Sequence, residues 1–458
     1  MAGLFSLLNV GASALFTEQR ASTLAGQNIA NAATPGYTRQ DSVRQSVGPN
    51  GYGVRFLSAE RSVDPLLRRR LEEQASVTSF SQRRADRLGA LEDIASDIGP
   101  NGVSASLDNF FGSIRELTAT ADDPAQRQEI VSDGQTLASA VNRLGADFEQ
   151  ARQDLNRDII GDIDSANAAS ETVARLNAAI MVTEANGAQA NELRDERDAA
   201  VRQLSELVGA YGIEDEQGNV TVVANGIVLA QSDRSYTIQA TPDASGTVTL
   251  EVPGTTRGDI TSRIVGGSVG GAIDARDGAV ADSIAAVDQL AFDLATQFNA
   301  TYRGFTGLDG ASGRDFFVEP SAVTGAAAAL RVEAAVVADP STFQAAADAA
   351  SLPGDTSGAA ALVALESAAV ANGGTETLGE SARGILSSLG TVVRSATNED
   401  EVQQGRLEAL EVVREQVSGV STDEQLLELD RSQSAYQAAG RLIQTVDEML
   451  ETVLSLKQ

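Results

Sequence analysis

The chain contains no cysteine and no histidine, and only one lysine, Lys457, among its 458 residues. Without cysteine, neither disulfide bonds nor thiolate chemistry can contribute. Without histidine, the chain lacks the side chain that most often serves as a general base and as a metal ligand. These absences argue against an enzyme, and we predict no catalytic residue, no metal site and no cofactor.

Positive charge as a whole is scarce, because 34 Lys and Arg stand against 64 Asp and Glu, a formal net charge of −30. A chain this acidic repels phosphate groups, which argues against nucleic acid or an anionic membrane surface as a partner. No apolar run reaches the roughly 20 residues that span a bilayer. The first arginine is Arg20, so no basic region precedes the first apolar residues, and a Sec signal peptide is not expected.

Two polar segments could be mistaken for chemical sites. Gly266-Gly267 and Gly270-Gly271 superficially resemble a phosphate-binding loop, but neither a Lys-Ser/Thr pair nor the Gly-x-Gly-x-x-Gly spacing is present, so we predict a flexible strand-to-helix turn. Asp195, Glu196 and Asp198 could pass for paired catalytic carboxylates. They share one helical turn with two arginines, and Arg194 and Asp198 have the spacing of an exposed helix ion pair. We therefore predict a structural role for them.

The loop from Gly304 to Gly313 and the residues after it contain two further candidates. Asp309 and Asp315 are separated by glycine-rich sequence, but their spacing does not fit an EF-hand calcium loop. Ser312 lies in Gly-Ala-Ser-Gly, which is not a nucleophile elbow, and no histidine exists to activate it. We predict neither a cation site nor a nucleophile here.

The C-terminal tail, from about Thr422 to Gln458, carries the most regular pattern of the chain. Thr422 and Gln425 have capping-box spacing, and Gly419 upstream is a helix break. Apolar residues then recur at alternating three- and four-residue steps, interrupted only by Ser432, which predicts a coiled-coil seam along one helix. The seam residues are Leu429, Tyr436, Ala439, Ile443, Val446, Leu450 and Val453.

The N-terminus shows a second helical pattern, from Leu4 to Ala32, which stops at Thr34-Pro35-Gly36. Either terminal helix could dock on its own domain, the two could pair with each other, or they could pair with copies of themselves. We predict that they form an assembly interface, which comprises the seven tail residues together with Leu4, Leu8, Leu15 and Ile29.

Between the termini the pattern is mainly helical, with helix starts at Asp64-Pro65 and Asp123-Pro124, a long apolar period after the second, and a hairpin turn at Asn225-Gly226. Residues 37–63 are expected to be irregular apart from a short strand near Val54 to Leu57, and residues 211–265 have the two-residue period and the turn sequences of β-hairpins. We predict a mainly α fold with a β-rich insert and discontinuous, nested domains. The predicted domains are a terminal coiled-coil domain (1–37 with 420–458), a long-helix bundle (38–210 with 266–305 and 376–419), the β-rich insert (211–265) and a small mixed, Ala/Gly-rich outer subdomain (306–375).

Both ends of the chain resemble the signatures of bacterial flagellar axial proteins, the family of rod, hook and hook-associated proteins. The N-terminal match is NIANAATPGYTRQ, from Asn28 to Gln40, and the C-terminal match runs from Val417 to Gln458. Three internal stretches, NELRDERDAAVRQLSELVG, IVGGSVGGAIDARD and GLDGASGRDFF, resemble a hook-associated member of that family rather than hook or distal rod proteins. The residues of the N-terminal motif are Asn28, Ala30, Asn31, Thr34, Pro35, Gly36 and Tyr37.

The resemblance implies a structural adaptor that is exported by the flagellar type III pathway and that joins hook to filament outside the cell. It implies as partners copies of the same chain, hook protein, the second hook–filament junction protein and an export chaperone on the C-terminal helix. Another axial protein of hook or distal rod type is the first alternative. A secreted adhesin that binds through its β insert and a carboxylate-based cell-wall hydrolase are alternatives from other classes.

The energetics of the two ends lead to a hypothesis about order. Fixing one residue's backbone costs about 1–2 kcal/mol, whereas burying a large aliphatic side chain returns about 1.5–3 kcal/mol. Only about a third of each terminal helix lies on its apolar stripe, so a lone pair of helices roughly breaks even. We therefore hypothesise that residues 1 to about 36 and about 422 to 458 are mobile in the free subunit and fold on assembly.

Overall fold

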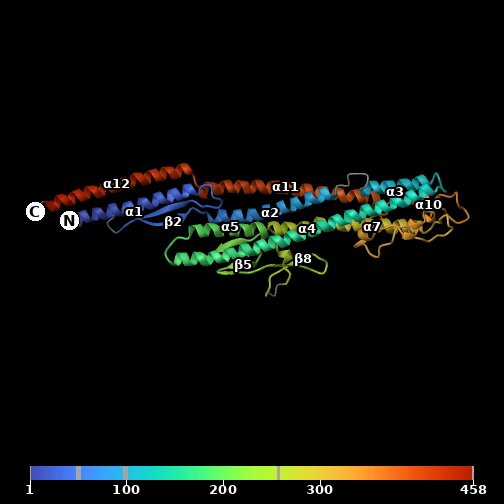
Figure 1. Ribbon diagram of the computed structural model, residues 1–458, viewed down its shortest axis with the longest axis horizontal. Coiled ribbons are helices and arrows are strands. Elements are labelled where there is room, and N and C mark those ends of the chain that lie inside the picture. Colours follow the sequence, from blue (N-terminus) through green and yellow to red (C-terminus); the bar gives the residue numbers. More distant parts are fainter. Residues whose placement is uncertain (1, 48–52, 96–101, 255–257, 456–458) are drawn as a thin grey trace.

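The computed structural model describes residues 2–47, 53–95, 102–254 and 258–455. These residues form a long rod of helices, with both termini at one end and β structure along the side (Figure 1). A mostly helical fold with a small β-rich insert was predicted, and this is confirmed. The helices are α1 (Ala2–Ala30), α2 (Pro65–Ala95), α3 (Val103–Leu117), α4 (Pro124–Ala185), α5 (Asn191–Val208), α6 (Gly267–Ala275), α7 (Ala281–Tyr302), α8 (Ala326–Ala329), α9 (Ala334–Ala338), α10 (Ser357–Ala364), α11 (Leu378–Ser418) and α12 (Thr422–Ser455).

Helices α2, α4, α11 and α12 begin at a residue whose side chain caps the helix. Asp64 Oδ1 accepts a hydrogen bond from Leu66 N at 2.8 Å, and Pro65 opens α2. Asp123 and Pro124 open α4 in the same way. For α12 the predicted cap was wrong by one residue, because Ser421 Oγ accepts from Glu424 N at 3.4 Å. Gln425, which we had placed in that cap, is buried instead.

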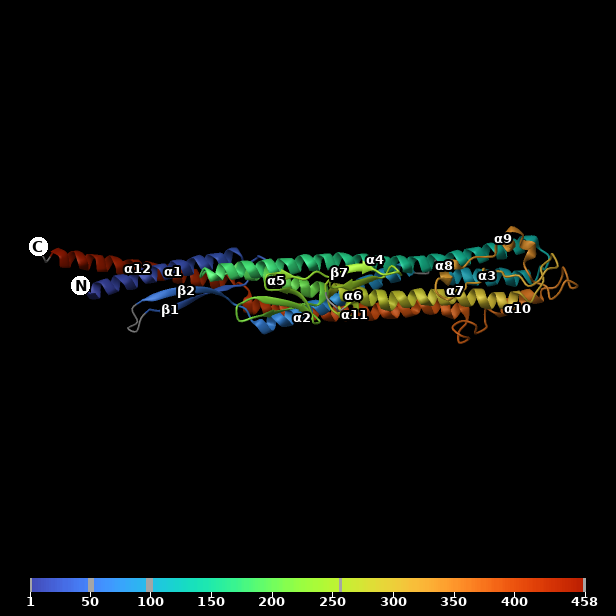
Figure 2. The same ribbon diagram turned by 90° about the horizontal axis from the view of Figure 1, so that it is seen from below.

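The 62-residue helix α4 is the spine of the rod (Figure 2). Helices α2, α3, α5, α6 and α7 pack against it, and α11 runs along α2. At the end far from the termini, aromatic rings fill the core, with centroids of Phe316 and Phe317 4.8 Å apart. Phe343 and Leu362, from the predicted outer subdomain, belong to the same continuous core. The proposed domain boundaries stay a prediction.

We predicted a flexible strand-to-helix turn at 266–271. In the structure Gly266 is the N-cap of α6, and the residues from Gly267 onward are helical. Gly267 has a φ of +68°, and a Cβ there would lie 2.4 Å from the carbonyl carbon of Leu207. A Cβ on Gly271 would lie 2.3 Å from Phe80 O. The glycines therefore let α6 touch the backbones of α2 and α5. Sequence spacing could not reveal this, because both contacts come from distant segments.

The β-rich insert contains β3 to β8, arranged as a four-stranded antiparallel sheet in the order β3-β4-β5-β6 and a separate hairpin, β7-β8. Asn225 and Gly226 both have positive φ, as a two-residue hairpin turn requires, which confirms the turn predicted between β4 and β5. The strands are β3 (Tyr211–Glu214), β4 (Val220–Ala224), β5 (Ile227–Gln231), β6 (Arg234–Ser235), β7 (Gln239–Pro242) and β8 (Val248–Glu251).

Asparagines on α4 attach this insert to the rod. Asn167 donates to Ile238 O and accepts from Ile238 N, both at 2.9 Å. Asn177 does the same with the N–H and C=O of Val220, at 3.1 and 2.8 Å. A side-chain amide has one donor group and one acceptor group, like the backbone of a neighbouring strand. Each asparagine on α4 therefore binds the backbone of the insert as a neighbouring strand would.

Residues 37–63 are more regular than predicted. Strands β1 (Gln40–Ser46) and β2 (Val54–Arg61) pair antiparallel, with Gln40 opposite Arg61, and lie along α1 (Figure 1). The sequence did not show β1 because its residues are almost all polar. Hydrogen bonds from Asn28 and Asn191 hold β1 in place instead of an apolar face.

Candidate assembly site at the termini

The terminal helices α1 and α12 pack against each other within one chain. The buried side chains of α12 recur every seven residues, at Gln425, Ser432, Ala439 and Val446. On α1, a Cβ added to Gly11 would lie 2.7 Å from Ile443 Cγ1, so this glycine allows the helices to approach closely. The contact is therefore built from small and polar residues as well as from aliphatic ones.

The predicted seam residues are buried to very different degrees. Val446 is 1% exposed and Ala439 8%, whereas Tyr436 and Val453 are exposed. The other seam residues, Leu429, Ile443 and Leu450, are half-buried, and so are the four predicted interface residues of α1, Leu4, Leu8, Leu15 and Ile29. Several large apolar side chains that we had not singled out lie on the outside, among them Phe5 and Phe16 of α1 and Leu454 of α12. The role of this seam in assembly stays a prediction.

Asn28 of the N-terminal motif connects both ends of the chain. Its side chain is 1% exposed. Its Nδ2 donates to Gln40 O and to Gln425 Oε1, both at 2.9 Å, and its Oδ1 accepts from Gln40 N at 3.1 Å and from the Tyr37 hydroxyl at 2.8 Å. This amide thus pairs with β1 as a strand would and also holds α12. The sequence indicated Asn28 only by resemblance, assigned Gln425 to a helix cap, and gave no role to Gln40.

The remaining motif residues shape the turn that follows α1. Thr34 Oγ1 donates to Asn31 Oδ1 at 3.3 Å, and Gly36 has a φ of +81°, which explains a glycine there. Burial and the nearby Asp195 carboxylate raise the pKa of Tyr37 to about 12, so its hydroxyl stays protonated and donates to Asn28. Ala30 and Pro35 are exposed.

The turn is also bonded to the point where α11 ends. Arg39 N donates to Ser418 O at 2.9 Å, and Ser62 Oγ donates to Val417 O at 3.1 Å. Ser62 N in turn donates to Arg39 O at 2.8 Å. The segments on both sides of the β1–β2 hairpin therefore meet the last residues of α11, just before α12 begins.

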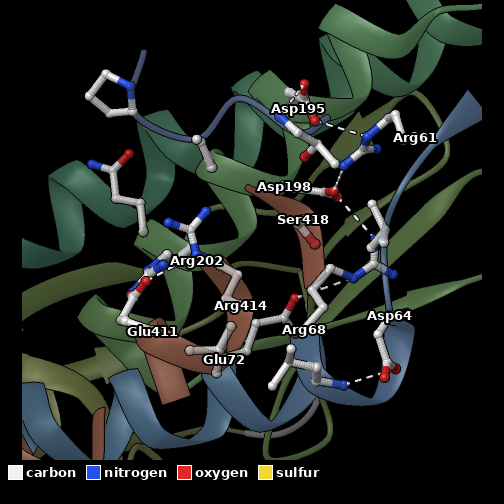
Figure 3. Close-up of a pocket in the computed structure, with 18 of the residues that line it drawn as sticks. Arg61, Asp64, Arg68, Glu72, Asp195, Asp198, Arg202, Glu411, Arg414 and Ser418 are labelled. Atoms are coloured by element: carbon white, nitrogen blue, oxygen red, sulfur yellow. Dashed lines mark hydrogen bonds and ion pairs between the residues drawn. The ribbon is translucent and has the colours of Figure 1, made fainter. Parts of the chain in front are cut away.

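Helix α5 binds the same hairpin through its polar residues. Asn191 Nδ2 donates to Gln40 Oε1 at 2.9 Å and to Ala59 O at 2.7 Å. Arg61 forms ion pairs with Asp195, at 2.8 Å, and with Asp198 (Figure 3). The predicted structural role of these two carboxylates is consistent with this geometry.

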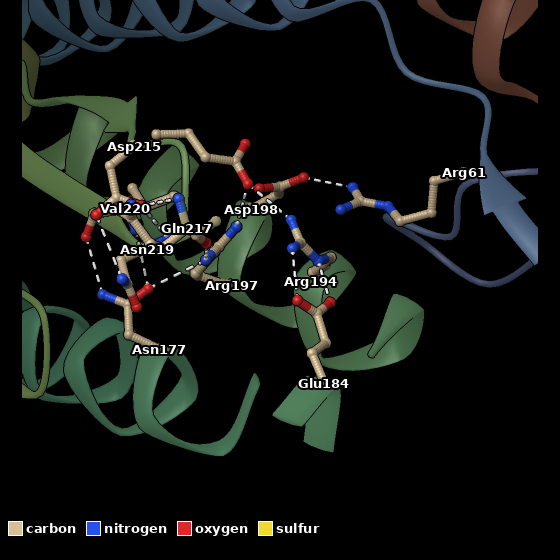
Figure 4. A network of polar contacts seen from close by, with 12 residues as sticks. Arg61, Asn177, Glu184, Arg194, Arg197, Asp198, Asp215, Gln217, Asn219 and Val220 are labelled. Atoms are coloured by element: carbon tan, nitrogen blue, oxygen red, sulfur yellow. Dashed lines mark hydrogen bonds and ion pairs between the residues drawn. The ribbon is translucent and has the colours of Figure 1, made fainter. Parts of the chain in front are cut away.

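The predicted ion pair within α5 is wrong in its partners. Arg194 binds Glu184 at 2.8 Å (Figure 4) and Glu214 at 2.7 Å. Asp198 instead binds Arg61 and, at 3.2 Å, Arg68 (Figure 3). Residues from other elements reach these charges first, which helix spacing alone cannot predict. The neighbouring Arg197 is fully buried and donates to Asn177 Oδ1 at 3.1 Å and to Gly218 O at 2.7 Å, and burial lowers its pKa.

A cavity of about 430 Å³ lies between α2, α5, α11 and the turn after α1 that contains Pro35 and Gly36 (Figure 3). Leu67 and Leu71 contribute to its apolar walls. Its arginines are engaged by carboxylates, as Arg202 is by Glu411. Burial raises the pKa of the Glu72 carboxyl to about 7, although Gly212 N donates to it at 3.2 Å.

The two aspartates weighed as a cation site are occupied by arginines: Asp309 by Arg314, and Asp315 by Arg303. Within residues 2–47, 53–95, 102–254 and 258–455, no group of three or more acidic side chains could hold a metal ion. The same residues include no helix that is long and apolar enough to cross a membrane.

An extended helical rod with paired termini, whose polar clusters are neutralised internally, is the architecture of a structural subunit. Two family models match the chain: "Flagellar hook-associated protein FlgK helical domain" over residues 88–317, and "Flagellar basal body rod FlgEFG protein C-terminal" over residues 414–456. The chain belongs to the flagellar hook-associated protein FlgK family, a family of structural flagellar proteins and not of enzymes.

Individual relatives agree with this assignment. Flagellar hook-associated protein 1 of Bacillus subtilis (strain 168) is 24% identical over 502 residues, covering 99% of each chain. Its counterpart in Escherichia coli (strain K12) is 26% identical over 327 residues, which are 68% of this chain and 60% of that one. The flagellar hook junction protein FlgK from Burkholderia pseudomallei has the same fold, with a TM-score of 0.68, 16% identity, and coverage of 76% of this chain and 100% of that chain.

Replacing Asn28 should weaken the contacts that join α1 to β1 and to α12. In Asn28→Ala, the N–H and C=O of Gln40 and the Gln425 amide lose a buried partner, at a cost of about 3–5 kcal/mol in total. We expect the Gln40 amide to exchange its hydrogen at least about 100-fold faster, as measured by hydrogen exchange on the full chain. Asn31→Ala, which removes only exposed local bonds, is the control. An unchanged Gln40 exchange rate in Asn28→Ala would contradict the role of this amide.

Glu72 should make stability fall as pH rises. The folded pKa of about 7 lies above the unfolded value near 4.5, so the folded chain binds the extra proton and the free energy of unfolding decreases between about pH 4.5 and 7. Glu72→Gln should remove up to about 3 kcal/mol of this decrease. Thermal unfolding of both chains from pH 4.5 to 8 measures it, with exposed Glu73→Gln as the control. Parallel pH profiles of the unaltered and Glu72→Gln chains would refute the assignment.

Proposed function

We propose that this protein is an adaptor that joins the flagellar hook to the filament. Its family membership supports this role, because relatives along the chain are hook-associated proteins and a solved structure of the same fold is a hook junction protein. The proposal includes export by the flagellar type III system and a final location outside the cell, at the hook–filament junction.

The chain polymerises through its terminal helices, which act as a coiled-coil domain. The observation that carries this step is the apolar surface that remains when α1 and α12 are already paired. Phe5 is 53% exposed, Phe16 69% and Leu454 61%. Exposed apolar patches on a helical pair are typical of surfaces that bind other proteins. Contacts with neighbouring copies would bury these side chains and complete the folding of both ends.

The chain is organised in nested domains and contacts several other flagellar proteins. The terminal domain, the long-helix bundle, the β-rich insert and the outer subdomain are nested in the chain, as their residue ranges in the sequence suggest. Copies of this chain form a ring or tube that contacts hook protein on one side and the second hook–filament junction protein on the other. Before assembly, an export chaperone covers the C-terminal helix and prevents its apolar stripe from aggregating.

Deleting the gene tests the adaptor role. We expect cells that still build hooks but release filament protein into the medium, because nothing remains at the hook tip for the filament to grow on. Electron microscopy of the cells and analysis of the culture medium measure the two results, and restoring the gene on a plasmid is the control. Filaments of normal length on the hooks of the deletion strain would reject the proposal.

A further inference from the structure

A groove of about 410 Å³ opens between α1 and α12, beyond the Asn28–Gln425 contact. Gln19, Ser22 and Thr23 line it from α1, and Ser432, Tyr436 and Gln437 from α12. These side chains are short or uncharged. The one carboxylate beside them, Glu18, is engaged by Arg44 at 3.2 Å. The groove therefore offers an uncharged depression in a very acidic chain.

Ser432 indicates that this groove is incomplete in a single chain. Its side chain is 1% exposed, and its hydroxyl has no hydrogen-bond partner among the described residues. Thr445 and Thr452 on the same helix instead donate to the carbonyl four residues before them. A buried hydroxyl without a partner costs about 1–3 kcal/mol. A partner from outside the chain would recover that free energy.

The outer face of α1 has the properties that an occupant of this groove needs. Residues 1–17 contain no charged side chain, and Phe5, Asn9 and Phe16 are exposed at steps of four and seven residues. Such spacing lines up along one face of a helix. The Asn9 amide can donate to a hydroxyl, and the phenylalanines can cover the apolar walls on either side of it.

Charge restricts the occupant further. With a net charge of −30, copies of this chain repel each other except where both surfaces are uncharged. The rest of the exposed surface of α12 has an excess of negative charge, which includes Asp447, Glu448 and Glu451 towards its C-terminal end. The groove and the stripe of Phe5, Asn9 and Phe16 therefore provide two uncharged surfaces that can meet without this repulsion.

We infer that the groove of one copy receives the Phe5–Asn9–Phe16 face of α1 from a second copy, an inference that rests on the proposed assembly through the termini. The two surfaces lie on different parts of the chain, so the contact is heterologous and repeats from copy to copy, as a ring or tube requires. In this contact, Asn9 of one copy lies at the same height along the helix axis as Ser22 of the next copy. Because the helix rises 1.5 Å per residue, the separation between positions 9 and 22 offsets neighbouring copies by about 20 Å along the axis.

Because the natural chain has no cysteine, introduced cysteines test this contact directly. A strain that lacks the unaltered gene produces two full-length chains together, one carrying Asn9→Cys and the other Gln437→Cys. Flagella are isolated and oxidised gently, and crosslinked heterodimers are counted by mass spectrometry. The matched control replaces Gln437→Cys with Glu448→Cys, an exposed position in the acidic C-terminal part of α12. We expect about ten-fold more heterodimer for the Asn9–Gln437 pair than for the control.

The outcomes separate this inference from the proposed function. If the chains reach the flagellum but the two cysteine pairs crosslink equally, or neither crosslinks, the groove contact is wrong and the adaptor role stands. If the unaltered chain never reaches the flagellum, the proposed function fails and this inference with it. Phe16→Asp provides an independent check, because Phe16 is 69% exposed: it should leave thermal unfolding of the free chain unchanged and reduce incorporation about ten-fold. Unchanged incorporation would overturn the inference.

Discussion

The hydrogen bonds of one buried amide fix how the two ends of this chain leave the rod. Asn28 holds β1 through the backbone of Gln40 and holds α12 through Gln425. The same device recurs where Asn167 and Asn177 bind the insert. A helix-borne amide binds one extended segment in one register, since both its donor and its acceptor must be satisfied. Apolar packing alone is less selective. The rod therefore depends on polar contacts for its geometry and on its core for most of its stability.

Much of the helical framework could be predicted because its signals are local. Asp64-Pro65 and Asp123-Pro124 mark helix starts through bonds that reach only two or three residues. Asn225-Gly226 specifies a hairpin through its own backbone angles. The long apolar period of α4 needs no knowledge of what packs against it. The family could be recognised for a similar reason, since short motifs carry it.

The rest could not be predicted because it depends on residues far apart in the sequence. The hairpin β1–β2 has little apolar alternation, and it is held by Asn28 and Asn191. The glycines of α6 are explained only by the backbones of Phe80 and Leu207 beside them. At the candidate site, the seam residues were visible in the sequence, but the orphaned hydroxyl of Ser432 and its groove need both helices in place.

The central claim is that the ends of the chain are incomplete until other copies cover them. Trypsin tests it directly, because Arg20 lies on α1 and Arg431 and Arg441 on α12, all exposed. The free chain and isolated flagella are digested side by side. The account predicts that the free chain is cut after these arginines well before the bundle is, and that the assembled chain is not. A free chain that resists cleavage there as long as its bundle survives would contradict it.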